Sequence, residues 1–362
     1  MNCDRNPTAE QRERVKKLME TYAAFGVSLG EWVGVCPGPC VTRFDFQPDP
    51  QQSLTGIARY SQDVALQLSV YRLRMVYPQI GSATLGIEVP NPDGWRVPYE
   101  EVLGSETFAR FDDPLPLALG VGAGDEPVCL GLSRAPHLLI GGQPGSGKTR
   151  LLYLLAAGLM QAATPERVRL LLITPQPREF APLERSRYLW EPVVDDPAAA
   201  TERLQALWQE CQRRCDLLAE QGVRSIDDYT EKTDLPLCRI VVLVDEFAPV
   251  MAQSRGSFEQ TVCKLAQKGR PVGIHLVLTT AELTPANVTG IIKANIPTRI
   301  ALSTRTPMES RTIMDAVDAA CLMLGGDMLL CSGMAKPRRI QAADLDVLQL
   351  ESIVAQREEE LQ

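Results

Sequence analysis

The sequence predicts an α/β fold in which a mostly parallel sheet follows a small α+β domain. From about residue 136 onward, short and wholly apolar segments alternate with helical ones. Continuous apolar strands indicate burial on both faces of a sheet, and alternation with helices is typical of parallel strands. A glycine-rich loop between the first of these strands and a helix over 150–160 indicates the same fold. The expected strands are 138–140, 168–173, 240–244, 275–280, 299–302 and 328–331.

The first hundred residues have a different pattern. Apolar residues there recur at helical spacing in two segments and alternate as in strands in three others. The expected helices are 13–25 and 53–70, and the expected strands are 41–46, 71–76 and 84–89. Gly81 and Ser82 should form the turn between the last two strands. A leading helix followed by strand, helix, strand and strand predicts a small α+β domain.

The length of 362 residues fits two domains. We expect an N-terminal helix and arm over 1–26, the α+β domain over 27–105, the parallel-sheet domain over 106–345 and a C-terminal tail over 346–362. No apolar run reaches the roughly 18 residues of a membrane helix, and the N-terminus has no signal segment. These features predict a cytoplasmic protein without a membrane segment.

Charge and cysteine content exclude some function classes. The net charge of −8 argues against a simple basic nucleic-acid-binding module, so any DNA contact must use a local positive surface. Ten cysteines could form disulfides or bind a metal ion, but Cys211 and Cys215 lie on an apolar helical stripe, where thiols behave as small hydrophobes. The two histidines, His137 and His275, stand beside apolar runs at no standard zinc spacing. A zinc site is therefore not expected.

A complete phosphate-loop motif separates the first apolar strand from the helix that follows it. The glycines let backbone N–H groups turn toward phosphate oxygens, and the helix N-terminus adds its positive dipole end. Lys148 would reach the outer phosphates, and the Thr149 hydroxyl would ligate Mg²⁺. The expected nucleotide-binding residues are Gly142, Gln143, Pro144, Gly145, Ser146, Gly147, Lys148, Thr149 and Arg150.

Two acidic residues, Asp245 and Glu246, follow the apolar strand 240–244. In this fold a carboxylate at the C-terminal end of a buried strand lies beside the phosphate loop. Asp245 would bind in the Mg²⁺ shell, and Glu246 would orient and deprotonate the attacking water. The two motifs together predict a RecA-like P-loop ATPase core that uses ATP and Mg²⁺.

The chain resembles the motor region of the FtsK/SpoIIIE family of DNA translocases from about residue 20 to residue 335. The segments Lys293-Ala-Asn-Ile-Pro-Thr-Arg299 and Ser310-Arg-Thr-Ile-Met-Asp315 are specific to that family rather than to P-loop proteins in general. Further shared segments are 38–48, 86–91, 116–120, 137–140, 245–248, 266–268, 273–276 and 325–328.

The resemblance implies a homo-hexameric ring that encircles double-stranded DNA and moves along it, as in chromosome partition at cell division or in plasmid or phage DNA transfer. It also implies nucleotide sites completed by a neighbouring subunit's arginine, for which Arg311 is the first candidate and Arg299 the second. DNA phosphates should be contacted by a basic cluster, which we assign to Lys264, Lys268 and Arg270.

The chain departs from the family pattern at three places. Relatives usually read Ala-Thr-Gln-Arg-Pro where this chain has Thr279-Thr280-Ala281-Glu282-Leu283, which questions the coupling of hydrolysis to movement. Thr174-Pro175-Gln176 replaces an Asp-Pro-Lys, and Pro249 replaces an acid. The family's membrane region and C-terminal winged helix are not visible, so sequence-directed loading is not expected of this chain.

Three functions are therefore open. The leading hypothesis is an ATP-driven motor for double-stranded DNA. A related ATPase that drives protein export is the second, and DNA stimulation of hydrolysis would separate the two. The third is a diverged ring subunit that binds ATP without turnover, which the residues Ala281 and Glu282 motivate.

Overall fold

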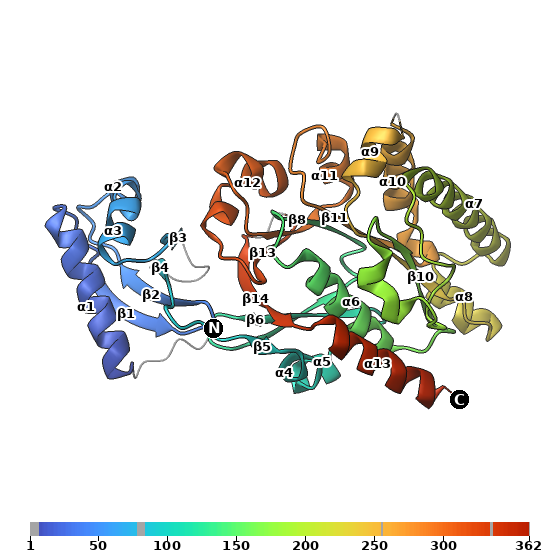
Figure 1. Cartoon of the computed structure of the whole chain (residues 1–362), viewed down its shortest axis with the longest axis horizontal. Coiled ribbons are helices and arrows are strands. Elements are labelled where there is room, and N and C mark those ends of the chain that lie inside the picture. The colour runs from blue at the N-terminus through green and yellow to red at the C-terminus, as the bar shows by residue number, and fades with distance from the viewer. Residues whose placement is uncertain (1–6, 78–83, 255, 334–335, 362) are drawn as a thin grey trace. The chain divides into compact units, whose positions relative to one another are not determined.

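The computed structural model describes residues 7–77, 84–254, 256–333 and 336–361, and the expected turn at Gly81 and Ser82 lies outside them. The chain divides into two compact units (Figure 1). The first runs to Val97 and includes 121–126 and 339–341, and the second contains the rest. Within the described ranges, every helix is too short or too polar to cross a lipid bilayer.

The first unit is a four-stranded antiparallel sheet in the order β1-β2-β4-β3, packed against helices. Phe44 and Phe46 of β2 are fully buried with Leu18 and Tyr22 of α1. The single helix expected over 53–70 is two helices broken at Tyr60, whose ring stacks on Phe25 at 5.1 Å. The elements are α1 (Ala9–Ala24), β1 (Glu31–Cys36), β2 (Val41–Gln47), α2 (Leu54–Arg59), α3 (Ser61–Gln67), β3 (Arg74–Val76) and β4 (Leu85–Pro90).

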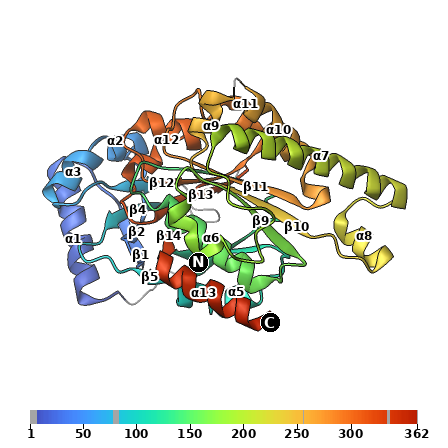
Figure 2. The same ribbon diagram turned by 45° about the vertical axis from the view of Figure 1, so that its right-hand side comes forward.

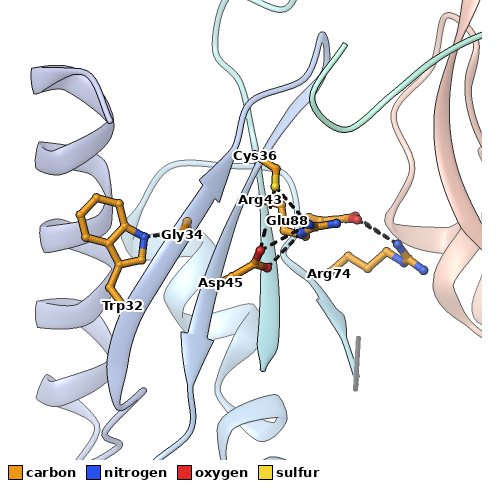
Figure 3. A network of polar contacts seen from close by, with 7 residues as sticks. All are labelled: Trp32, Gly34, Cys36, Arg43, Asp45, Arg74 and Glu88. Carbon is orange, nitrogen blue, oxygen red and sulfur yellow. Dashed lines mark hydrogen bonds and ion pairs between the residues drawn. The ribbon is translucent and has the colours of Figure 1, made fainter. Parts of the chain in front are cut away.

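Ion pairs are buried on the first unit's sheet (Figure 3). Side chains alternate along a strand, so Arg43 and Asp45 lie on the face opposite Phe44 and Phe46, where their N–O distance is 2.9 Å. Gly86 makes room for this pair, because a Cβ there would stand 2.9 Å from Cδ of Arg43. Glu88 accepts from Arg74 at 3.0 Å and from Arg339 at 2.8 Å. Burial acts to raise the pKa of Glu88, but the two guanidiniums outweigh it and hold that pKa below its usual value.

The second unit is built on a ten-stranded sheet in the order β7-β6-β14-β13-β12-β8-β11-β10-β9, with β5 paired to β14. The five strands β9, β10, β11, β8 and β12 are parallel, and β13 runs antiparallel to β12. The predicted mostly parallel α/β core is thus confirmed. The strands are β5 (Val97–Pro98), β6 (Pro116–Gly122), β7 (Pro127–Gly131), β8 (His137–Gly141), β9 (Val168–Ile173), β10 (Arg239–Val244), β11 (Ile274–Thr280), β12 (Thr298–Leu302), β13 (Asp327–Ser332) and β14 (Arg338–Asp344).

Helices cover the central strands. The helices α7 and α10 pack against each other, as Figure 2 shows, and bury Leu204, Leu207 and Phe258 against Val242 and Leu276 of the sheet. Except for α6 and α13, the remaining helical elements are short. The bounds are α4 (Tyr99–Leu103), α5 (Glu106–Ala109), α6 (Lys148–Ala162), η1 (Pro177–Leu183), α7 (Pro197–Gln221), α8 (Ile226–Thr233), α9 (Ala248–Gln253), α10 (Ser257–Lys268), η2 (Arg270–Val272), α11 (Gly290–Asn295), α12 (Pro307–Met314), η3 (Asp318–Cys321) and α13 (Val347–Glu360).

Most of the segment 346–362, expected as a tail, forms the helix α13. Asp346 caps its N-terminus in a capping box with Gln349, so two orphan backbone donors are satisfied. The helix packs against α6 and η1. Leu350, Ile353 and Val354 are buried in that contact face. The glutamates that suggested a solvated tail occupy the last turn of this amphipathic helix.

Candidate nucleotide-binding and hydrolysis site

The glycines of the phosphate loop are required by the backbone path between β8 and α6. Gly145 and Gly147 have φ values of +75° and +110°, where a residue with a Cβ is disfavoured. Gly142 is confined by its neighbours, because a Cβ there would stand 2.6 Å from Oγ of Ser146 and 2.8 Å from Cβ of Leu302. The loop therefore has the glycine-dependent shape that lets backbone N–H groups face an anion.

The polar side chains of the loop have open hydrogen-bonding capacity. The Lys148 ammonium donates to the carbonyl oxygens of Gly142 at 2.8 Å and Gln143 at 3.2 Å. Burial holds the pKa of Lys148 below its usual value, although the nearby Glu246 and Asp245 carboxylates act to raise it. The buried Ser146 hydroxyl has no hydrogen-bond partner, and Thr149 makes no side-chain hydrogen bond with any described residue. These groups fit the oxygens of a bound nucleotide and its metal ion.

Neighbouring segments hold the loop in place. The backbone N–H of Gln143 donates to the Ser303 carbonyl at 2.8 Å, and the side-chain amide of Gln143 donates to the Ser303 hydroxyl at 3.0 Å. Arg150 is ion-paired with Asp344 of β14, while Pro144 is exposed. Of the nine residues assigned to the nucleotide, Gln143 and Arg150 thus also anchor the loop to the sheet.

Asp245 stands at the end of β10 as the sequence predicts. Its carboxylate accepts a hydrogen bond from the Thr174 hydroxyl and another from the Thr279 hydroxyl, each at 3.2 Å. Burial raises the pKa of Asp245; the two threonine hydroxyls oppose this rise, and the charges of Glu179 and Glu246 add to it. A bound cation would relieve that unfavourable charge, so the environment fits a magnesium ligand.

Glu246 has an unusual backbone and a fixed carboxylate. Its φ of +59° lies in the left-handed region, which is uncommon for a residue with a Cβ and clusters at functional sites. The Thr280 hydroxyl donates to one carboxylate oxygen at 2.6 Å, and the Ala281 N–H donates to the other at 2.7 Å. The structure therefore brings Lys148, Asp245 and Glu246 together at the C-terminal edge of the parallel strands.

The two arginine candidates differ in their surroundings. Arg299 donates to the Asp315 carboxylate at 2.6 Å and to the Ile313 carbonyl at 3.0 Å, and Lys293 donates to the same carboxylate at 2.6 Å. Arg299 is thus engaged within its own chain. Arg311 is exposed on α12, and its guanidinium forms no hydrogen bond or ion pair with a described residue. Only Arg311 of these two arginines is presented for contact with another molecule.

The basic residues assigned to DNA lie away from this site. Lys264 and Lys268 are exposed on α10, with their ammonium groups 6.0 Å and 5.9 Å from the ring centre of Trp208 on α7. Arg270 is exposed in η2, just before β11. Because the phosphate loop lies at the opposite end of the parallel strands, the structure does not bring these residues together with the nucleotide site.

The sequence pattern did not identify four residues that act on the groups of this site. Thr174, Thr279 and Thr280 hold the two carboxylates, and the charge of Arg305 acts on Lys148. All four stand at or just after the C-terminal ends of parallel strands, the edge of the sheet at which α/β folds bind ligands. That position along the chain is the signal that could have identified them.

Neither histidine is arranged as a metal ligand. The Nε2–H of His137 donates to the Ala266 carbonyl at 3.0 Å, and its Nδ1 accepts from the Leu276 N–H at 3.1 Å. His275 donates through Nδ1 to the Pro136 carbonyl at 3.0 Å. Burial lowers the pKa of His137 to about 4 and that of His275 to about 3, so both rings are neutral. In the described part of the chain, no three histidine, cysteine or acidic side chains gather as metal ligands.

The sequence matches the FtsK/SpoIIIE family over residues 100–285 and the FtsK alpha domain over residues 2–91. It is 37% identical over 94% of its length to a protein named DNA translocase FtsK from Caldanaerobacter subterraneus, and 37% identical over 96% to DNA translocase SftA from Bacillus subtilis. DNA translocase SpoIIIE from Bacillus subtilis is 35% identical over 94% of the chain. The chain covers 48%, 37% and 45% of these three relatives, so it spans less than half the length of each.

Solved structures share the fold. The pCW3 conjugation coupling protein TcpA, in a monomer form with ATPγS, superposes with a TM-score of 0.64 over 95% of this chain and 99% of that one, at 19% identity. The cytoplasmic domain of the type VII secretion ATPase EccC from Thermomonospora curvata gives a TM-score of 0.63 over 73% of this chain and 34% of that one, at 22% identity. At such identities the likeness concerns the fold alone.

Proposed function

The chain belongs to the FtsK/SpoIIIE family, and from this premise we propose that it is the motor part of an ATP-driven translocase for double-stranded DNA. The observation that carries the proposal is the convergence of a complete phosphate loop with two differently held carboxylates at one edge of the sheet. The match of residues 2–91 to the FtsK alpha domain favours DNA over an exported protein as the cargo.

We assign the chemical roles within one chain as follows. Lys148 leaves the loop carbonyls to which it donates and contacts the outer phosphates, while Thr149 and Asp245 hold Mg²⁺. Mg²⁺ held there would supply positive charge to offset that of the phosphate oxygens. Glu246 orients the attacking water and accepts its proton, with its carboxylate kept close to Lys148 by Thr280 and Ala281.

The remaining parts of the proposal concern assembly and DNA. We propose a homo-hexamer in the cytoplasm in which Arg311 of one subunit completes the nucleotide site of the next and offsets phosphoryl charge. Arg311 is exposed and forms no ion pair with any described residue, and these two features support this role over Arg299. Lys264, Lys268 and Arg270 remain the proposed DNA contacts. The proposed domains are those over 1–26, 27–105, 106–345 and 346–362.

The test is the rate of ATP hydrolysis with and without long duplex DNA, for wild type beside Glu246→Gln. We expect duplex DNA to raise turnover severalfold and Glu246→Gln to lower it at least about 100-fold while ATP still binds. Equal turnover with and without DNA would favour a protein cargo instead. ATP binding without hydrolysis under both conditions would favour a ring subunit that has lost turnover.

A further inference from the structure

The carboxylate of Glu246 is held by the end of the neighbouring strand rather than by its own strand. In the parallel pair of β10 and β11, Val244 stands opposite Leu278, so Glu246 falls beside the last residues of β11. The Thr279 hydroxyl accepts a hydrogen bond from the Glu246 N–H at 3.1 Å, and the Thr279 carbonyl accepts one from the Phe247 N–H at 2.9 Å. The backbone around Glu246 is thus pinned to β11 in its left-handed conformation.

Thr280 joins the side chain of Glu246 to the loop that follows β11. Its fully buried hydroxyl donates to Glu246 at 2.6 Å and accepts from the Glu282 N–H at 3.0 Å. The Glu282 carboxylate in turn accepts from the Asn287 side chain at 3.1 Å, which closes the loop on itself. One hydroxyl therefore links the carboxylate to the fold of the loop over 281–288.

We propose that Thr280 is a positioning residue for ATP hydrolysis, which fixes the Glu246 carboxylate beside the phosphate loop through the folded loop over 281–288. This inference rests on the proposed function, because it assigns Glu246 the role of orienting water. The short bond of 2.6 Å to an ionised acceptor is of the strong, charge-assisted kind. A small displacement of a positioned base reduces turnover steeply, so the hydroxyl controls rate rather than nucleotide affinity.

The same geometry explains how the chain retains this arrangement without the family's Gln-Arg pair. The second donor to Glu246 is the backbone N–H of position 281, which alanine supplies as well as glutamine does. The contact of position 282 with Thr280 is also made by a backbone N–H. The departures Ala281 and Glu282 therefore leave both supports of Glu246 in place.

The experiment compares Thr280→Val, which keeps the shape and removes the hydroxyl, with Thr280→Ser, which restores it. We expect Thr280→Val to lower kcat about 10- to 100-fold with the Kd for ATPγS changed less than about twofold, and Thr280→Ser to recover most of the rate. In the Glu246→Gln background, Thr280→Val should add no further loss, because the two residues act as a unit. Thr261→Val is the matched control, since its buried hydroxyl donates to the Ser257 carbonyl on α10.

A second measurement does not depend on hydrolysis. In a double-mutant cycle on the unfolding equilibrium constant, Thr280→Val and Glu246→Gln should depart from independence by at least about threefold. If wild type hydrolyses no ATP but this coupling is present, the proposed function fails and the positioning contact stands. An unchanged kcat in Thr280→Val, or an equal loss of rate and ATPγS affinity that Thr280→Ser does not recover, would overturn the proposal.

Discussion

The polar groups at the C-terminal edge of the parallel strands in the second unit differ from those at the N-terminal edge in how fully they are hydrogen-bonded. At the C-terminal edge, the Ser146 hydroxyl is buried without a partner among the described residues, Glu246 has a positive φ, and burial raises the pKa of Asp245. At the N-terminal edge, His137 uses both ring nitrogens in hydrogen bonds. The first edge keeps capacity for a ligand, whereas the second meets its hydrogen-bonding needs internally.

Arg214 shows how completely the N-terminal edge is satisfied. This buried guanidinium on α7 donates to the carbonyl of Cys238 at 2.8 Å, to that of Val272 at 2.9 Å and to Glu210 at 2.7 Å. Buried polar groups stabilise a fold only when they are paired in this way. The comparison teaches that substitutions at one edge should remove activity, while those at the other should remove stability.

The largest effect expected at the C-terminal edge is on turnover. Glu246→Gln should lower kcat for ATP hydrolysis by about 100- to 10,000-fold, because the amide cannot accept the proton of the attacking water. Steady-state hydrolysis beside equilibrium binding of ATPγS measures the change. A loss of binding equal to the loss of rate would contradict the assignment, since Glu246 would then be supporting the loop rather than the reaction.

At the N-terminal edge, Arg214→Ala should lower the free energy of unfolding by about 3 kcal/mol, because the buried Val272 carbonyl and the partly buried Cys238 carbonyl lose their donor. Arg213→Ala is the matched control: this neighbour pairs with the same Glu210 but is exposed, so its loss should stay within about 1 kcal/mol. Urea unfolding measures both. Equal losses of stability in the two variants would contradict the claim that the buried, fully paired guanidinium contributes more than the surface ion pair.

The low pKa values of the two buried histidines at this edge predict that acid lowers the stability of the fold. Above pH 6.5 the histidines are neutral in both the folded and the unfolded chain. Below pH 6.5 the unfolded chain binds protons at both histidines, whereas in the folded chain His137 is protonated only near pH 4 and His275 only near pH 3. Stability should therefore fall as the pH is lowered from 6.5 toward 4, by about 1.4 kcal/mol per pH unit for each histidine. His275→Asn keeps a donor for the Pro136 carbonyl and should flatten the fall; an unaltered slope would show that carboxylates cause it.

The smallest expected effect is a gain of stability at the C-terminal edge. Because the folded state raises the pKa of Asp245, the folded chain binds its proton more tightly than the unfolded chain does. Stability is therefore lost as the pH rises through the folded pKa, and the charge remains unfavourable at pH 7. Asp245→Asn should raise the Tm of the nucleotide-free protein at pH 7 and remove the further rise that MgATP gives the wild type. A lower Tm in Asp245→Asn would contradict this account.

The sequence predicted the parts of the site that are contiguous in the chain. The phosphate loop and the pair Asp245-Glu246 are recognisable because their residues are adjacent and follow apolar strands. Thr280 was not recognised as a partner of Glu246, because that contact depends on the register between β10 and β11. The sequence ranked Arg311 before Arg299, but it could not predict the ion pair that engages Arg299, since only the folded chain brings Asp315 to Arg299.

The fold shows the same division. Most of the buried central strands, such as β9 and β10, were predicted close to their observed ends, but the fully buried β6 was not predicted. The edge strands β1 and β7 are partly exposed, and β1 and β14 carry charged residues, so these segments are less clearly predicted than the central strands. The C-terminal helix was hidden by its terminal glutamates, although its capping box was readable in the sequence.

Displacement of a labelled third strand from triplex DNA tests the proposed translocase most directly, because it detects movement along duplex DNA rather than hydrolysis. We expect the wild type to release the third strand with MgATP and to release none with ATPγS, and Glu246→Gln to be inactive with either nucleotide. If DNA-stimulated hydrolysis occurs without release of the third strand, the chain is an ATPase that does not translocate, and the central claim is wrong.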